Sequence, residues 1–247
     1  MELLRTKRLL GLGVVFLFFA ITSPLLARYM TEFIALLVPA DEAIGLLIPD
    51  PVWTDSYAQF YSNISQIGNI TLIFLLMGAI ASEKQLGTAD LLLTKGLGYG
   101  AFVLTKFTVI AVAVVLTILV SGVVVHFYTV ALFETAGGLA GAILGTLAYS
   151  LFLLLIVALT LFCGAIAKST VFTALLAFLG FLAISALSAL PRVGDYLPGN
   201  LLARSMELTG GVLEWDATLW GPLGTTLGLT VVLLAVTVLV LRKQEGA

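Results

Sequence analysis

Long apolar stretches separated by short polar segments make up almost the whole chain. Six of these stretches contain no Asp, Glu, Lys or Arg, and each is long enough to cross a bilayer core of about 30 Å, which takes roughly 20 apolar residues in a helix. We expect one membrane-spanning helix around each stretch, at about residues 9–29, 58–82, 101–130, 137–166, 170–190 and 218–241. The predicted fold is an all-α integral membrane protein with one transmembrane domain over residues 1–247.

Composition and charge agree with this fold and add an orientation. Hydrophobic residues make up 60% of the chain and charged residues only 11%, against roughly 25% charged residues in soluble domains. With the N-terminus inside, nine of the 12 Lys and Arg residues fall in cytoplasmic segments, as the positive-inside rule requires. We therefore expect both termini in the cytoplasm, in a multi-pass protein of the plasma membrane. The net charge of −2 gives no reason to expect a nucleic-acid partner.

Two outside segments combine apolar clusters with helix breakers. Residues 29–55 contain three prolines, and residues 191–220 contain two prolines and several glycines. Such segments cannot span the membrane, so we expect short external helices at the lipid interface before the second and sixth spans. In the second segment, Asn200 is the expected N-cap of a helix from Leu201 to Leu208 that ends at Gly210.

The second span opens with the polar stretch "SNISQIGNIT". On an α-helix, Ser62, Gln66 and Asn69 share one face because they are spaced i, i+4 and i, i+3. Polar groups in lipid must find partners or line a cavity. This face is therefore either the wall of a translocation path or a set of hydrogen bonds between helices.

A stripe of small residues begins the fourth span. Gly137, Gly141 and Gly145 recur at four-residue spacing, which lets two helices approach closely. We expect close packing within the subunit, and the alternative is a seam between two subunits.

The chain has no residues for chemistry of its own. A phosphate-binding P-loop needs a Gly-Lys pair, and none occurs. His126 is the only histidine and Cys163 the only cysteine, which argues against a multi-histidine metal site and excludes an intramolecular disulfide. We expect no catalytic residue, no metal site and no bound cofactor.

The largest cytoplasmic segment is "SEKQLGTADLLLTKGLGYGAFVLTK", residues 82–106. Thr88 is a good N-cap, Asp90 suits the positive end of a helix dipole, and Lys95 and Gly96 mark the other end. These signals predict a helix of about two turns with leucines around it, which is too short to be stable alone in water. The helix therefore needs the membrane or a protein partner to lie on.

Residues of this segment resemble a family signature. Glu83, Gly87-Thr88, Leu91-Leu92-Leu93 with Thr94, and Lys106 follow one another as in the "E-x3-G-T-x2-L-L-L-S … K" pattern of type 2 ABC transporter permeases, with Thr94 where Ser is usual. The resemblance covers about residues 56–106 and extends loosely to the six-span layout. Among such permeases, the second span with "MGAIASEK" looks most similar to those of the nitrous-oxide-reductase maturation type.

The resemblance implies the membrane subunit of an ATP-driven exporter. Such permeases form homodimers or heterodimers on two copies of a separate cytosolic ATPase, which holds ATP and Mg. The short helix between the second and third spans would dock on that ATPase, with the loop around Lys168 as a second contact. The implied coupling residues are Glu83, Gly87, Thr88, Asp90, Leu91, Leu92 and Leu93. The family often has Pro, Ser and Arg where Gly96, Gly98 and Tyr99 stand here, which makes the exit from this helix more flexible.

Two other functions fit less of the sequence. An ion-coupled secondary transporter would favour a membrane-embedded acid or lysine, which all six apolar stretches lack. A membrane assembly or anchoring protein would recruit a cytosolic partner through the same short helix without transport.

Overall fold

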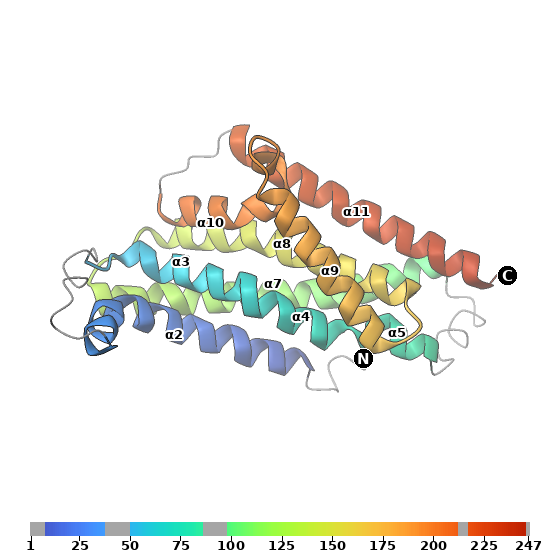
Figure 1. Cartoon of the computed structure of the whole chain (residues 1–247), viewed down its shortest axis with the longest axis horizontal. Helices are drawn as coiled ribbons and strands as arrows, with labels where there is room; N and C mark the ends of the chain where they lie inside the picture. The colour runs from blue at the N-terminus through green and yellow to red at the C-terminus, as the bar shows by residue number, and fades with distance from the viewer. Residues whose placement is uncertain (1–7, 38–49, 86–97, 212–216, 246–247) are drawn as a thin grey trace.

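The structure, a computed structural model, describes residues 8–37, 50–85, 98–211 and 217–245, and its regular elements there are all helical. Figure 1 shows a bundle of long helices around α8 (Leu139–Ile166). The other long helices are α2 (Arg8–Leu37), α7 (Tyr99–Phe133), α9 (Thr170–Ser188) and α11 (Ala217–Glu245). The second span is built from four consecutive pieces, α3 (Trp53–Asn63), η2 (Ile64–Gly68), α4 (Asn69–Leu76) and α5 (Gly78–Gln85).

Six helices in the described part of the chain are long and apolar enough to cross a membrane, which confirms the predicted all-α class and the number of spans. Their bounds are Leu10–Phe33, Trp53–Gln85, Tyr99–Phe133, Leu139–Ile166, Thr170–Ser188 and Leu219–Gln244. The first helix runs on to Leu37, beyond the predicted end at residue 29. The reason is local, because "MTEFIALL" (residues 30–37) contains neither Gly nor Pro before Pro39.

Two predicted short helices cannot be compared with the structure. The coupling helix, Ala89–Lys95, lies outside the described residues. Of the segment in which an external helix was expected before the second span, residues 38–49 also lie outside them.

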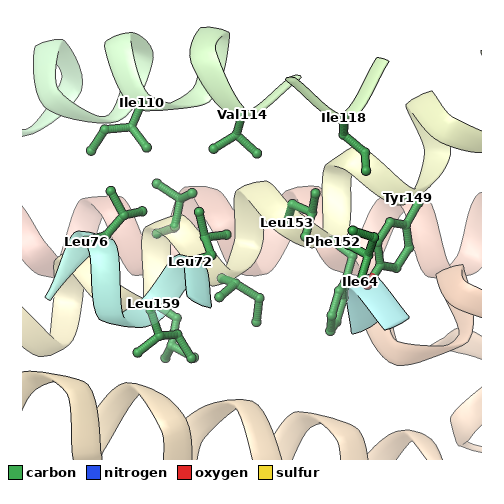
Figure 2. Close-up of a cluster of buried hydrophobic side chains, with 14 of the residues drawn as sticks. Ile64, Leu72, Leu76, Ile110, Val114, Ile118, Tyr149, Phe152, Leu153 and Leu159 are labelled. Atoms are coloured by element: carbon green, nitrogen blue, oxygen red, sulfur yellow. The ribbon is translucent and has the colours of Figure 1, made fainter. Parts of the chain in front are cut away.

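The core of the bundle is centred on α8. In its most apolar window 72% of the residues are buried, against 22% for α9. Figure 2 shows Tyr149, Phe152, Leu153 and Leu159 of α8 among apolar side chains of the second span and of α7. Since α8 is enclosed on most sides, the exposed apolar side chains lie mainly on the outer helices, where a bilayer solvates them.

The first residue of α2 and the last residue of α11 point toward the same end of the bundle (Figure 1). We name this the terminus-side end and the opposite one the far end. Lys106 and Tyr128 on α7 stand 22 positions apart, as do Trp220 and Arg242 on α11. At 1.5 Å per residue this separation is about 33 Å, close to a bilayer core flanked by basic residues and interfacial aromatic rings. On the second span, Ser62 lies 22 positions before Lys84, which is the same separation.

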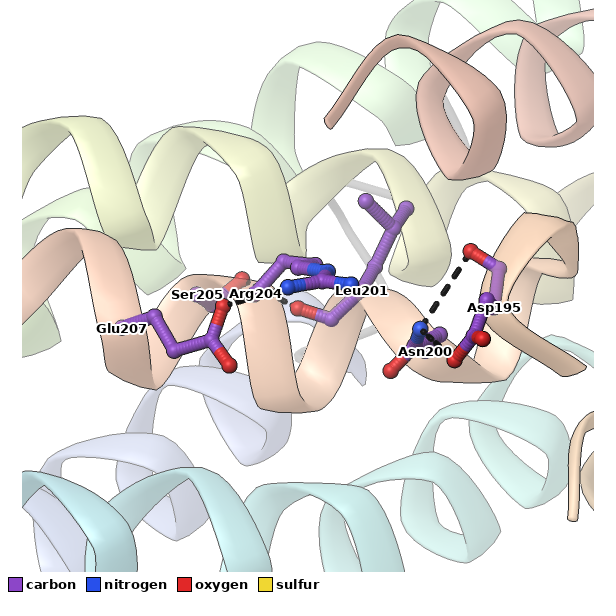
Figure 3. A network of polar contacts seen from close by, with 6 residues as sticks. All are labelled: Asp195, Asn200, Leu201, Arg204, Ser205 and Glu207. Atoms are coloured by element: carbon purple, nitrogen blue, oxygen red, sulfur yellow. Dashed lines mark hydrogen bonds and ion pairs between the residues drawn. The ribbon is translucent and has the colours of Figure 1, made fainter. Parts of the chain in front are cut away.

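A short helix, α10 (Leu201–Thr209), lies beside the far-end half of α8 and ends at Gly210, as predicted. Asn200 stands at the predicted N-cap position of α10. Its side chain makes no capping hydrogen bond, because its backbone has helical angles (φ −71°, ψ −13°) where a capping residue is usually extended. Its amide nitrogen donates to the Asp195 carbonyl at 3.3 Å. Figure 3 shows this hydrogen bond, together with the Arg204–Glu207 ion pair of 2.8 Å on α10.

Candidate functional site

The second span changes its winding where its polar residues begin. Residues Ile64–Gly68 form one turn of π-helix between α3 and α4. A π turn contains an extra residue, and such turns occur often at functional sites. Gly68 lies at a close approach to α2, since a Cβ there would stand 3.2 Å from the ring of Phe16. No pattern in the sequence announced this turn.

The π turn separates the three polar residues that were predicted to share a face. Gln66 is exposed, and its amide donates to the Ser62 hydroxyl at 3.0 Å. Asn69 is completely buried, and its amide donates to the Ser65 carbonyl at 2.8 Å. The prediction of one shared face is therefore wrong, because the wider turn rotates Asn69 toward α8 while Ser62 and Gln66 stay at the surface.

Asn69 lies in a buried polar contact with α8. The Tyr149 ring is buried, and its hydroxyl lies near the side chains of Ser65 and Asn69. Neither the Tyr149 hydroxyl nor the Asn69 Oδ1 has a hydrogen-bond partner among the described residues. Polar groups of α8 and of the second span thus lie close together in a place where an unsatisfied polar group is costly.

Exposed and partly exposed polar residues continue toward the far end instead. Asp55, Gln59, Ser62 and Gln66 follow one another at spacings of four, three and four, which places them along one side of a helix. We name these four residues the polar face. Asp55 and Gln59 were not among the sequence candidates, although the same helical spacing would have found them.

Two hollows flank the polar face. The larger, about 480 Å³, lies between α2, α3 and α10 and is lined by Asp55, Gln59 and Ser62 among others. The smaller, about 260 Å³, is lined by Ser65 of the π turn and by Ser185 and Ser188 near the end of α9. The larger hollow has the volume of a small-molecule pocket. The polar face of the second span thus has open space on both sides.

The glycine stripe, with Gly137 just before α8 and Gly141 and Gly145 within it, lies directly against α10. A Cβ on Gly141 would stand 3.0 Å from the Leu208 carbonyl, and one on Gly145 would stand 2.5 Å from the Ser205 carbonyl. A Cβ on Gly137 would stand 3.0 Å from the Thr209 carbonyl. These distances leave no room for a side chain, so the stripe provides a contact within the subunit.

Two buried hydrogen-bond groups hold the far end together. The Tyr61 hydroxyl lies 3.2 Å from the Thr146 hydroxyl and 3.1 Å from the Thr209 hydroxyl, and so joins α3 to α8 and α10. The Tyr57 hydroxyl lies 2.8 Å from Nδ1 of His126 on α7. This contact gives His126 a structural role, and the described residues contain no cluster of three or more metal-ligating side chains.

At the terminus-side end, the structure describes two of the predicted coupling residues, Glu83 and Lys168. The Glu83 carboxylate pairs with Lys106 at 2.6 Å, and both side chains are mostly buried. Lys106 also donates to the Ala79 carbonyl at 2.7 Å and lies over the Phe102 ring. The other coupling candidates, from Gly87 to Leu93, lie outside the described residues.

Six apolar helices, with interfacial aromatic residues about one bilayer core away from basic ones, define a multi-pass helical membrane protein. A comparison with known proteins agrees with this class. Over 132 residues the chain is 23% identical to the uncharacterized transmembrane protein YxlG of Bacillus subtilis (strain 168). The match covers 53% of this chain and 51% of that relative, so the chain spans about half of the relative's length. No family model and no solved structure matches the chain.

Proposed function

We propose that this protein is the membrane-spanning permease subunit of an ATP-driven ABC exporter in the plasma membrane. A separate cytosolic ABC ATPase supplies the energy, and two permease subunits, identical or different, form the transport unit. The observation that carries this proposal is the Glu83–Lys106 pair. These residues are the first and last of the signature that resembles type 2 ABC permeases. Glu83 Oε1 lies 2.6 Å from Lys106 Nζ, so the ion pair joins the two ends of the signature.

The charge distribution supports an orientation with the terminus-side end in the cytoplasm. Lys84, Lys106, Lys168, Arg242 and Lys243 all occupy the terminus-side parts of their helices and turns. The positive-inside rule favours the cytoplasm for such an end. A cytosolic ATPase would then meet the segment between α5 and α7 and the turn at Lys168.

The polar face supports a translocation path at the far end. An exposed amide such as that of Gln66 is unfavourable against lipid tails, but it is well placed against water or a polar substrate. In a dimer that covers this side of the second span, the polar face and its larger hollow would line the outer mouth of the path. Asp55, Gln59, Ser62 and Gln66 would contact the substrate there.

Ion-coupled transport has less support. The ionisable side chains of the described spans lie toward the helix ends, apart from the tyrosines, His126 and Cys163. A coupling ion would need an acid or lysine within the membrane core. An assembly or anchoring protein would use the same coupling residues but would not need the open polar face.

Co-purification with an ATPase and a hydrolysis assay test the proposal. The full chain is co-expressed with a P-loop ATPase encoded beside it, and ATP hydrolysis is measured in proteoliposomes. We expect Leu92→Asp to abolish co-purification, because a charge within the predicted docking helix would remove the apolar contact that the sequence predicts. The control Lys243→Met should bind normally. Equal binding by Leu92→Asp would contradict the proposed docking, and absence of any ATP-dependent transport would favour the anchoring function.

A further inference from the structure

The last turn of α8, at the terminus-side end, has a backbone carbonyl that side chains of other helices bind. The final four carbonyls of a helix have no partner within the helix, and Ala165 is the next-to-last residue of α8. Its carbonyl accepts from Lys84 Nζ at 2.5 Å and from Gln244 Nε2 at 3.1 Å. Two side chains from different spans, α5 and α11, therefore meet at one oxygen atom. A cation also suits the negative end of the helix dipole.

Three consecutive side chains of α5 reach three different parts of the bundle. Glu83 pairs with Lys106 of α7, and Lys84 donates to Ala165 of α8. The amide of Gln85 donates to the Lys168 carbonyl, in the turn between α8 and α9, at 3.0 Å. The residue after Gln85 begins the segment that carries most of the coupling candidates. Each side chain thus ties the root of that segment to a different element.

From these contacts we infer that Lys84 and Gln244 are positioning residues that join α5, α8 and α11 into one rigid body at the terminus-side end. We name Lys84, Ala165 and Gln244 the junction. A displacement of α5 then moves α8 and α11 with it, while Glu83–Lys106 passes the same displacement to α7. This inference rests on the proposed function for the origin of the force, but the rigid connection itself does not depend on it.

A purely local capping role for Lys84 predicts a different result from a junction. If Lys84 only caps α8, removing Gln244 affects the end of α11 and leaves α5 unchanged. If the three helices form one body, loss of either donor loosens the other donor's helix as well. The decisive measurement is therefore the amide hydrogen exchange of the helix that does not carry the substitution.

Amide hydrogen exchange of the full chain in detergent makes this measurement. We expect Gln244→Leu to raise exchange at least about threefold in the last turn of α5, and Lys84→Met to do the same in the last turn of α11, as expected when local opening becomes easier. Lys243→Met is the matched control, since Lys243 is exposed beside Gln244 and outside the junction. Lys84→Arg keeps a donor and should restore most of the protection. Wild-type exchange in α5 of the Gln244→Leu variant would overturn the junction.

A second measurement tests what the junction does in transport. In proteoliposomes with the ATPase, Lys84→Met should keep ATPase binding and hydrolysis, but the nucleotide-dependent change in exchange along α11 should fall at least about threefold. An unchanged response of α11 would show that the connection is not the route of the movement. If the wild-type chain binds no ATPase, the proposed function fails, while the exchange measurement in detergent still decides the junction.

Discussion

The two ends of the bundle are held together by different chemistry. At the far end, α10 lies on glycines of α8, and neutral hydroxyl groups of Tyr61, Thr146 and Thr209 join three helices. At the terminus-side end, Lys106 and Lys84 bind a carboxylate and a helix-end carbonyl. Charge-assisted hydrogen bonds are the stronger kind, whereas the far end combines neutral hydrogen bonds with the close approach of two helix backbones. The far end therefore depends on shape, and the terminus-side end depends on charge.

A side chain on the glycine stripe is the most damaging test of shape at the far end. Gly145→Leu would place atoms where the Ser205 carbonyl and the Thr209 side chain now lie, and backbone cannot move away cheaply. We expect the free energy of unfolding in detergent to fall by about 3 kcal/mol. Gly228→Leu is the control, because a Cβ at Gly228 meets nothing within 4 Å, and it should leave stability nearly unchanged.

Removing one charge tests the terminus-side end. Glu83→Gln leaves Lys106 mostly buried without its counter-charge, so we expect a loss of about 1–2 kcal/mol, between the values for exposed and fully buried pairs. Thermal denaturation in detergent measures it. The double variant Glu83→Lys with Lys106→Glu restores opposite charges and should recover at least half of the loss. No recovery would mean that the geometry around Ala79 and Phe102 matters more than the charge.

Two buried tyrosines form a matched pair for the smaller hydrogen-bond effect at the far end. Tyr61→Phe removes a hydroxyl that contacts both Thr146 and Thr209, and we expect a loss of about 1 kcal/mol. Tyr149→Phe removes a hydroxyl that has no partner among the described residues, so its effect on the free energy of unfolding should be smaller than that of Tyr61→Phe. The reverse order would show that the Tyr149 hydroxyl binds something, such as an ordered water.

Much of this architecture was predictable from the sequence, and the rest depends on contacts between distant segments. Uncharged stretches of sufficient length predicted six spans because the bilayer fixes helix length. The wrong face for Asn69 came from a π turn, which no local pattern reveals. Asn200 was predicted as a cap because propensity favours it, and it stands at that position, but its helical backbone angles leave the capping hydrogen bond unmade. Half of the polar face was predicted from the sequence, since Ser62 and Gln66 were candidates but Asp55 and Gln59 were not.

The polar face gives the smallest expected effect on stability and separates transport from folding. Gln66→Leu changes an exposed side chain whose amide contacts the Ser62 hydroxyl at 3.0 Å, so stability in detergent should change by less than about 0.5 kcal/mol. If the polar face lines the path, ATP-driven export by Gln66→Leu should fall severalfold while ATP hydrolysis continues, because the substrate loses a polar contact and the ATPase does not. Phe74→Leu, at an exposed apolar position of the same span, should leave both unchanged. Because Gln66→Leu is expected to fold normally, export at the wild-type rate would show that the translocation path lies elsewhere.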